Sequence, residues 1–185
     1  GPGIGIDNDD WQKSKDYLLS FEGLLILDAD ALNRISEFKL GSEFFLERKF
    51  QTWITPHSKE FLRLFPHIKG ETKVGLALKA AKEFNISILL KGANSIVAND
   101  KNAWQLFGTD SQTARAGLGD LLTGFVAGSS AIDLTFCRNL TTDFFAKYVL
   151  LHSFAASKCK TGSNASAIGD ELSKLMRNRK TRQIS

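Results

Sequence analysis

Apolar and polar residues follow one another along this chain in blocks that predict alternating strands and helices. Apolar blocks of strand length, each ending in polar residues, run from Phe21 to Leu27, Thr52 to Thr55 and Ile86 to Leu90. A helical apolar spacing covers Val74 to Phe84, and Pro56 can open a further helix as its first residue. Apolar strands that alternate with helices form buried parallel sheets. The pattern therefore predicts an α/β fold with a mostly parallel central sheet flanked by helices.

The second half of the chain begins with a predicted hairpin and continues as helices. Ser95 to Ala98 and Trp104 to Phe107 are separated by the polar residues 99–102, which is typical of an antiparallel pair at the edge of a parallel sheet. Helical apolar spacing then predicts helices over Leu121 to Ile132, Thr142 to Ser157 and Ile168 to Met176.

The length and composition suit a single folded domain. At 185 residues, 43% of them hydrophobic, the chain is long enough for a buried core, and we expect one domain over residues 1–185.

The basic charge is concentrated at the carboxyl end of the sequence. The formal net charge is +4, but the last twelve residues hold five basic residues and no acidic one, so the rest carries −1. A basic groove for nucleic acid is therefore not expected. No apolar run approaches the roughly 20 residues of a membrane helix, and Cys137 and Cys159 match no metal or redox spacing. We expect a cytoplasmic protein with reduced thiols and neither a membrane nor a nucleic-acid partner.

The most informative local motif is a glycine turn that leads into the predicted helix at 121–132. Gly117, Leu118 and Gly119 stand directly before Asp120. Glycines let the backbone approach a ligand closely, and the unpaired N–H groups at a helix start attract an anion, so the turn is a candidate phosphate site. A carboxylate is repelled by such an anion. Asp120 is therefore either an N-terminal cap or a base that takes a proton from a hydroxyl beside the phosphate.

Polar residues also follow the first two predicted strands, where ligands bind in open α/β sheets. After the first strand, Asp28, Asp30 and Asn33 could orient a hydroxyl or a hydrated magnesium ion, or either aspartate could cap the following helix. After the second strand, His57 and Glu60 lie three residues apart and face the same way on one helix. Glu60 could hold a magnesium-bound water, or the pair could serve a capping interaction with Thr55 or Ser58.

A lysine ends the third predicted strand. A lysine at the end of a buried strand is costly unless it reaches an anion or the rim, so Lys91 is either an anion ligand or a lysine that extends into solvent. Gly92 and Ala93 leave the next backbone amides open to a ligand, and the glycine cluster at residues 1–5 could approach one as well. Because these polar motifs each follow a strand or open a helix, they favour one shared site.

Five short motifs follow one another along the chain. They are residues 1–5 (GPGIG), 27–33 (LDADALN), 55–60 (TPHSKE), 90–93 (LKGA) and 117–120 (GLGD). In this order they resemble the ADP-dependent NAD(P)H-hydrate dehydratase family, which has a ribokinase-like fold and is often grouped with carbohydrate kinases. The resemblance implies an enzyme that repairs nicotinamide cofactors. ADP, or ATP, with Mg²⁺ would phosphorylate the hydroxyl of the hydrated ring, and loss of phosphate would restore NADH or NADPH.

The resemblance also implies a role for each matched residue. The adenine nucleotide would be bound by Lys91, Gly92, Ala93, Asn94, Ser95, Gly117 and Gly119. Asp120 would act as the base on the ring hydroxyl. Glu60, from its own position on the helix after the second strand, is the expected magnesium ligand through a bound water. The hydrated nicotinamide substrate would be contacted by Gly3, Gly5, Asp30, Asn33, His57 and Asp120.

The family pattern also bears on the extent of the domain. In this family the glycine motif that matches residues 1–5 lies after several strands and helices that this chain does not contain. We therefore expect this chain to be the carboxyl-terminal part of a ribokinase-like domain. We expect a homo-oligomer or a partner that supplies the missing half, because an exposed sheet edge favours association.

Two alternatives to the dehydratase function stay open. One is a small-molecule kinase of the hydroxyethylthiazole or hydroxymethylpyrimidine type, which leaves a stable phosphate ester, and the other is a non-catalytic nucleotide-binding subunit.

Overall fold

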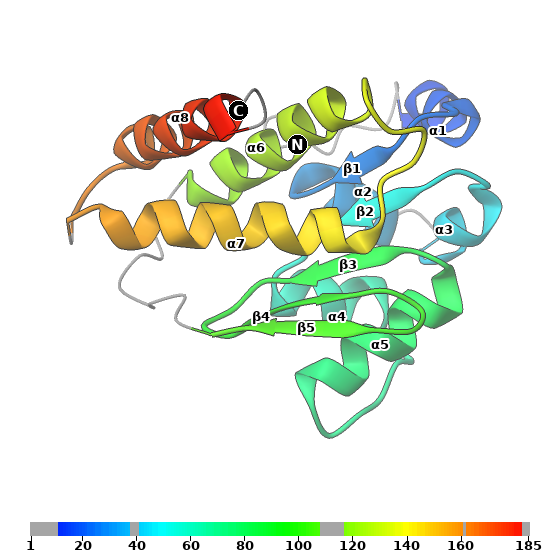
Figure 1. Cartoon of the computed structure of the whole chain (residues 1–185). Helices are drawn as coiled ribbons and strands as arrows, with labels where there is room; N and C mark the ends of the chain where they lie inside the picture. Colours follow the sequence, from blue (N-terminus) through cyan, green and yellow to red (C-terminus); the bar gives the residue numbers. More distant parts are fainter. Residues whose placement is uncertain (1–10, 38–40, 108–116, 161, 183–185) are drawn as a thin grey trace. The chain divides into compact units, whose positions relative to one another are not determined.

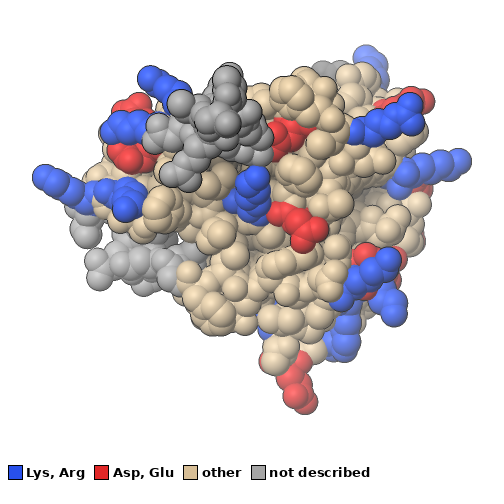
Figure 2. Space-filling view, in the orientation of Figure 1, with Lys and Arg blue, Asp and Glu red and all other residues tan. Residues whose placement is uncertain are grey.

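The computed structural model describes residues 11–37, 41–107, 117–160 and 162–182, and the other residues are grey in Figure 1 and Figure 2. The chain divides into two compact units, with the boundary between Leu106 and Phe107. The described strands all lie in the first unit, and the second unit contributes helices. The expectation of a single domain over residues 1–185 stays a prediction.

The first unit is built on a five-stranded sheet in the order β1-β2-β3-β4-β5 (Figure 1). β1 (Leu25–Leu27), β2 (Thr52–Ile54) and β3 (Ser87–Leu90) pair in parallel. β4 (Ser95–Ala98) runs antiparallel to β3, and β5 (Ala103–Leu106) runs antiparallel to β4, so four of the five strands point the same way. The predicted mostly parallel sheet with a hairpin at its edge is therefore confirmed.

Helices of the first unit pack around this sheet and form an apolar core. α5 packs against β3, β4 and β5, and α2 packs against α4. In the core, the rings of Phe65 and Phe84 stack with their centroids 5.0 Å apart, and Ile54 and Ile88 of the sheet are fully buried. The described helices are α1 (Trp11–Ser20), α2 (Asp30–Glu37), α3 (Glu43–Glu47), α4 (Ser58–Leu64) and α5 (Lys73–Phe84).

The helix after β2 begins later than predicted. α4 starts at Ser58 with His57 as its N-cap, so the prediction that Pro56 is its first helical residue is wrong. The reason is that the His57 ring accepts hydrogen bonds from the first backbone N–H groups of the helix, which fixes the helix start. Pro56 is buried, and its carbonyl accepts a hydrogen bond of 2.9 Å from the backbone N–H of Lys91. This bond ties the end of β2 to the end of β3.

The second unit contains α6 (Leu118–Asp133), α7 (Thr142–Lys158) and α8 (Ala165–Arg182), which confirm the three predicted helices and extend them. α7 packs against both α6 and α8. Tyr148 of α7 is fully buried, and its hydroxyl donates to Oδ2 of Asp133 at 2.7 Å. Within the residues that the structure describes, we find no helix with the length and apolar content that crossing a membrane requires.

One histidine in the second unit is buried, and one of its ring nitrogens lacks a hydrogen-bond partner. His152 of α7 is 8% exposed, and its Nε2 has no hydrogen-bond partner. Burial lowers the pKa of His152 from its ordinary 6.5 to about 4. Between these two values the unfolded chain binds a proton that the folded chain does not, so folding stability falls as the pH falls through this window.

We expect the free energy of unfolding to drop by about 3 kcal/mol between pH 7 and pH 4 through His152 alone. His152→Leu should remove most of this contribution, because leucine fills a similar volume and does not titrate. The measurement is urea unfolding of both proteins across this pH range. A matched Leu150→Ala variant, at an exposed position of the same helix that does not titrate, should keep the pH dependence of the wild type. An equal decline in wild type and His152→Leu would contradict this assignment.

Candidate active site

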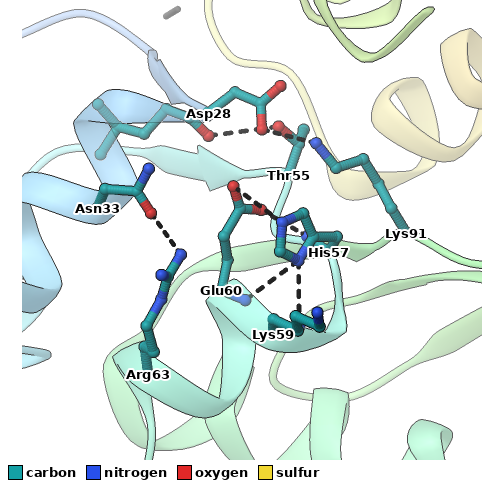
Figure 3. A network of polar contacts seen from close by, with 9 residues as sticks. Asp28, Asn33, Thr55, His57, Lys59, Glu60, Arg63 and Lys91 are labelled. Carbon is teal, nitrogen blue, oxygen red and sulfur yellow. Dashed lines mark hydrogen bonds and ion pairs between the residues drawn. The ribbon is translucent and has the colours of Figure 1, made fainter. Parts of the chain in front are cut away.

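The carboxyl ends of the three parallel strands bring an ion pair together in the first unit. Asp28 directly follows β1, and Lys91 directly follows β3. The Nζ of Lys91 donates to Oδ1 of Asp28 at 2.8 Å, and the Asp28 side chain is 2% exposed (Figure 3). Thr55, at the end of β2, is fully buried and donates its hydroxyl to the carbonyl of Leu27 at 3.4 Å. The anion expected for Lys91 is therefore supplied, in this structure, by a buried carboxylate of the same unit.

The turn from β1 into α2 is strained beside this ion pair. Ala29 has a φ of 50°, in the left-handed region that alanine rarely adopts. α2 then begins at Asp30, so the chain reverses into a helix within two residues of Asp28. Backbone strain of this kind costs about 1–3 kcal/mol and is often found at functional sites. The local geometry thus agrees with a functional role for this turn.

His57 and Glu60 form a capping box at the start of α4, in which the cap is His57 itself and not Thr55 or Ser58. Nδ1 of His57 accepts from the backbone N–H groups of Lys59 and Glu60, at 3.1 and 3.2 Å, and Oε2 of Glu60 accepts from the backbone N–H of His57 at 2.7 Å (Figure 3). Because Nδ1 accepts, the neutral ring carries its proton on Nε2. The His57 side chain is 49% exposed, so Nε2–H is a donor that a ligand can reach, whereas the Glu60 side chain is 7% exposed.

The segment after Lys91 is a tight turn closed by Ser95. The Ser95 hydroxyl donates to the carbonyl of Gly92 at 3.1 Å and accepts from the backbone N–H of Gly92 at 3.4 Å. Gly92, Ala93 and Asn94 are exposed, and Ser95 is buried. A Cβ at Gly92 would lie 3.2 Å from Nζ of Lys73, which is the end of a flexible side chain. The turn can therefore present its backbone to a ligand beside Lys91.

The glycine turn of the second unit leads directly into α6. Gly117 has a φ of 84°, which favours glycine, and its carbonyl accepts from the backbone N–H of Leu121 at 2.9 Å. Gly119 and Asp120 are therefore in the first turn of α6, and Asp120 is exposed. Asp120 also lines a groove of about 820 Å³ between α6 and α8. The carboxylate is accessible at a helix start, as both a cap and a base require.

The predicted site residues are thus placed in two separately described groups. In the first unit the strand ends gather Asp28, Thr55 and Lys91, and the capping box lies beside them because His57 pairs with Lys91 in an isolated parallel bridge. Gly117, Gly119 and Asp120 belong to the second unit. Gly3 and Gly5 lie outside the described residues. No cluster of three or more His, Cys, Asp or Glu side chains suited to a metal ion occurs in the described ranges.

Sequence reasoning missed one residue of this region. Arg63, in the last turn of α4, donates from Nη2 to Oδ1 of Asn33 in α2 at 2.6 Å (Figure 3). Its position three residues after Glu60, on the same helical face, was the available signal.

The fold defines the class of protein: a ribokinase-like α/β protein. The structure aligns with a ribokinase-like superfamily protein from Enterococcus faecalis with a TM-score of 0.77 and 23% identity, over 96% of this chain and 61% of that one. It also aligns with the ADP/ATP-dependent NAD(P)H-hydrate dehydratase from Bacillus subtilis, co-crystallised with ATP and Mg²⁺, with a TM-score of 0.73 and 23% identity, over 96% and 62% of the two chains. At these identities the likeness concerns the fold.

The sequence then defines the family. The sequence profile of NAD(P)H-hydrate dehydratase matches residues 1–177, so the chain belongs to the NAD(P)H-hydrate dehydratase family. The bifunctional NAD(P)H-hydrate repair enzyme of a Synechocystis species is 36% identical over 129 residues, which cover 69% of this chain and 24% of that protein. The resemblance inferred from the five motifs is therefore confirmed, and the chain spans about a quarter of the length of that relative.

Proposed function

We propose that this chain carries out the nucleotide-dependent dehydration of hydrated NADH or NADPH in the cytoplasm. The observation that carries the proposal is the family match over residues 1–177, which includes the glycine turn with an exposed Asp120 and the strand-end cluster around Lys91. The free thiols of Cys137 and Cys159 suit a reducing compartment. The two groups of residues supply different parts of the chemistry.

Asp120 is the base in this proposal. Its carboxylate takes the proton of the ring hydroxyl, and the oxygen attacks the terminal phosphoryl group of ADP or ATP, which releases AMP or ADP. The phosphate then leaves the ring carbon with the bonding electron pair, and loss of a proton from the neighbouring carbon restores the double bond. General-base assistance of the first step is worth about a hundred- to ten-thousandfold in rate.

The nucleotide is held by Lys91 and the exposed turn that follows it, together with the glycine turn before α6. Lys91 supplies a cation, and Gly92, Ala93, Asn94 and Ser95 supply a turn whose backbone a phosphate can approach. Gly117 and Gly119 supply N–H groups at the start of a 16-residue helix, where the dipole favours an anion.

The substrate is contacted by the polar residues at the starts of α2 and α4. Asp30 and Asn33 occupy the first turn of α2, and the half-exposed His57 ring offers its Nε2–H at the start of α4. We assign Gly3 and Gly5 to the same substrate on the family pattern. The polar groups of these residues can form hydrogen bonds with the hydroxyl and amide groups of a hydrated nicotinamide.

Magnesium would enter with the nucleotide phosphates. Mg²⁺ keeps several of its waters and is usually held by one or two carboxylates plus substrate phosphates. Glu60 is the carboxylate that we assign to such a bound water. Its Oε2 accepts from the His57 backbone, so Oε1, which lies 3.5 Å from His57 Nε2, is the oxygen that would accept from the water. The ion would supply charge neutralisation of the transferring phosphoryl group.

A further segment or a second copy of the chain completes the active protein in this proposal. The chain spans 24% of the Synechocystis relative and 62% of the Bacillus subtilis dehydratase chain, so these proteins contain sequence that it does not match. Assays should therefore include the chain alone and with any chain that copurifies with it.

The test is a product analysis with hydrated NADH, ADP and Mg²⁺. The proposal predicts equal amounts of NADH, AMP and inorganic phosphate. A stable phosphate ester with no NADH would identify a kinase instead. Nucleotide binding without any product, in the presence of the copurifying chain, would identify a non-catalytic binding subunit.

A further inference from the structure

Arg63 carries an exposed guanidinium group that a neighbouring helix holds in place. Its Nη2 donates to Oδ1 of Asn33 at 2.6 Å, across a sequence separation of 30 residues. Helix side chains lean toward the N-terminus of their helix, and in Figure 3 Arg63 extends from α4 toward Asn33. Because α2 and α4 each begin just after a strand, this contact draws the guanidinium toward the carboxyl ends of β1 and β2.

The charges around Arg63 leave this position favourable for an anion. Two buried carboxylates beyond the ends of β1 and β2 are engaged within the protein, Asp28 by Lys91 and Glu60 by the His57 backbone. Among the described residues, Arg63 forms no ion pair with a carboxylate. Asn33 is a neutral acceptor, so it orients the guanidinium without neutralising it. Lys59, on the same helix, is exposed and adds a second positive charge.

We propose that Arg63 binds a phosphate group of the dinucleotide substrate and that Asn33 is the residue that positions it. The inference rests on the proposed function, because hydrated NADH carries a pyrophosphate and hydrated NADPH carries an additional 2′-phosphate. A guanidinium binds phosphate oxygens through two parallel N–H groups, and one donor given to Asn33 leaves such a pair available. Arg63 thereby extends the substrate contacts from His57 along α4.

The test is calorimetric binding of NADH, NADPH and ATP to the whole chain and to four variants. Arg63→Gln should weaken NADPH binding about ten- to a hundredfold and leave ATP binding unchanged. If NADH binding weakens equally, the pyrophosphate is the group bound. If only NADPH binding weakens, it is the 2′-phosphate. The matched control Lys82→Gln removes an exposed cation of α5 and should change none of the three affinities.

The positioning role of Asn33 is tested by non-additivity. Asn33→Ala should weaken NADPH binding, and the loss in the double variant should be clearly smaller than the sum of the two single losses, because Asn33 positions Arg63 in addition to its own contact with the substrate. Fully additive losses would show that Asn33 and Arg63 act independently, which would overturn the positioning role.

The outcomes separate this inference from the proposed function. Unchanged NADH and NADPH affinities in Arg63→Gln, or a loss confined to ATP, would overturn the inference while leaving dehydration intact. A wild type that forms no NADH from the hydrate, but whose dinucleotide binding still depends on Arg63, would overturn the function and keep the phosphate contact. A wild type that binds neither dinucleotide overturns the inference as well.

Discussion

Asp120→Asn is expected to lower the rate of dehydration by about a hundredfold or more. Asparagine keeps the size and the hydrogen-bonding ability of the side chain at the start of α6, but it cannot accept the proton of the ring hydroxyl. Nucleotide binding should be preserved, because removal of a negative charge beside a phosphate does not weaken an anion site. The measurement is the initial rate of NADH formation at saturating ADP, together with ADP affinity by calorimetry.

The matched control for this variant is Asp170→Asn. Asp170 is an exposed aspartate of α8 that lines the same groove between α6 and α8 as Asp120. It should keep the wild-type rate, because we assign it no contact with the reacting hydroxyl. An Asp120→Asn protein that turns over at the wild-type rate would remove Asp120 from the mechanism and leave it as a helix cap.

Lys91→Met is expected to have the second largest effect, in this case on stability as well as on nucleotide binding. The variant leaves the carboxylate of Asp28, which is 2% exposed, without its cation. Removing one partner of a buried ion pair costs about 3–5 kcal/mol. The Lys91 side chain is 23% exposed, so we expect the lower end, about 3 kcal/mol. The measurement is the free energy of unfolding in urea at pH 7.

A double variant separates charge burial from packing in this prediction. Asp28→Asn combined with Lys91→Met removes both charges and should recover much of the lost stability, because no buried charge is left uncompensated. Lys101→Met, at an exposed lysine of the β4–β5 turn, controls for the loss of a lysine alone and should unfold like the wild type. A Lys91→Met protein as stable as this control would show that the ion pair contributes little.

Much of the fold is predictable because its signals are local. The three parallel strands are short apolar blocks followed by polar residues, and the hairpin from Ser95 to Leu106 has apolar segments around a polar turn. The turn itself is held by Asn99, whose Oδ1 accepts from the backbone N–H groups of Lys101 and Asn102. Turn-forming residues and hydrophobic periodicity act over a few neighbouring residues, so both can be recognised in the sequence alone.

Two helices escape prediction for a physical reason. α1 is mostly polar, with Trp11 as its buried apolar residue, and α3 spans five residues. Neither is long or apolar enough to show a clear helical period. Their positions depend on tertiary contacts such as the packing of α3 against α5, which a local pattern does not contain.

The candidate site shows the same limit. Local spacing indicates that His57 and Glu60 share a helix, and it leaves open whether they serve a ligand or the helix start. The structure shows that Nδ1 of His57 and Oε2 of Glu60 cap the helix, so an external partner can use only the remaining polar atom of each side chain, Nε2 of His57 and Oε1 of Glu60. The partner of Lys91 is 63 residues away and that of Arg63 is 30 residues away. Both depend on which strands and helices become neighbours, which no single motif specifies.

The central claim, that this chain repairs a hydrated nicotinamide cofactor, is tested most directly by absorbance at the NADH band. Hydrated NADH is mixed with Mg²⁺ and the chain, alone and with any chain that copurifies with it, and ADP or ATP is then added. We predict a rise in absorbance that requires the nucleotide and is accompanied by one phosphate for each NADH formed. No rise with either nucleotide, in a sample that binds both nucleotide and dinucleotide, would contradict the account.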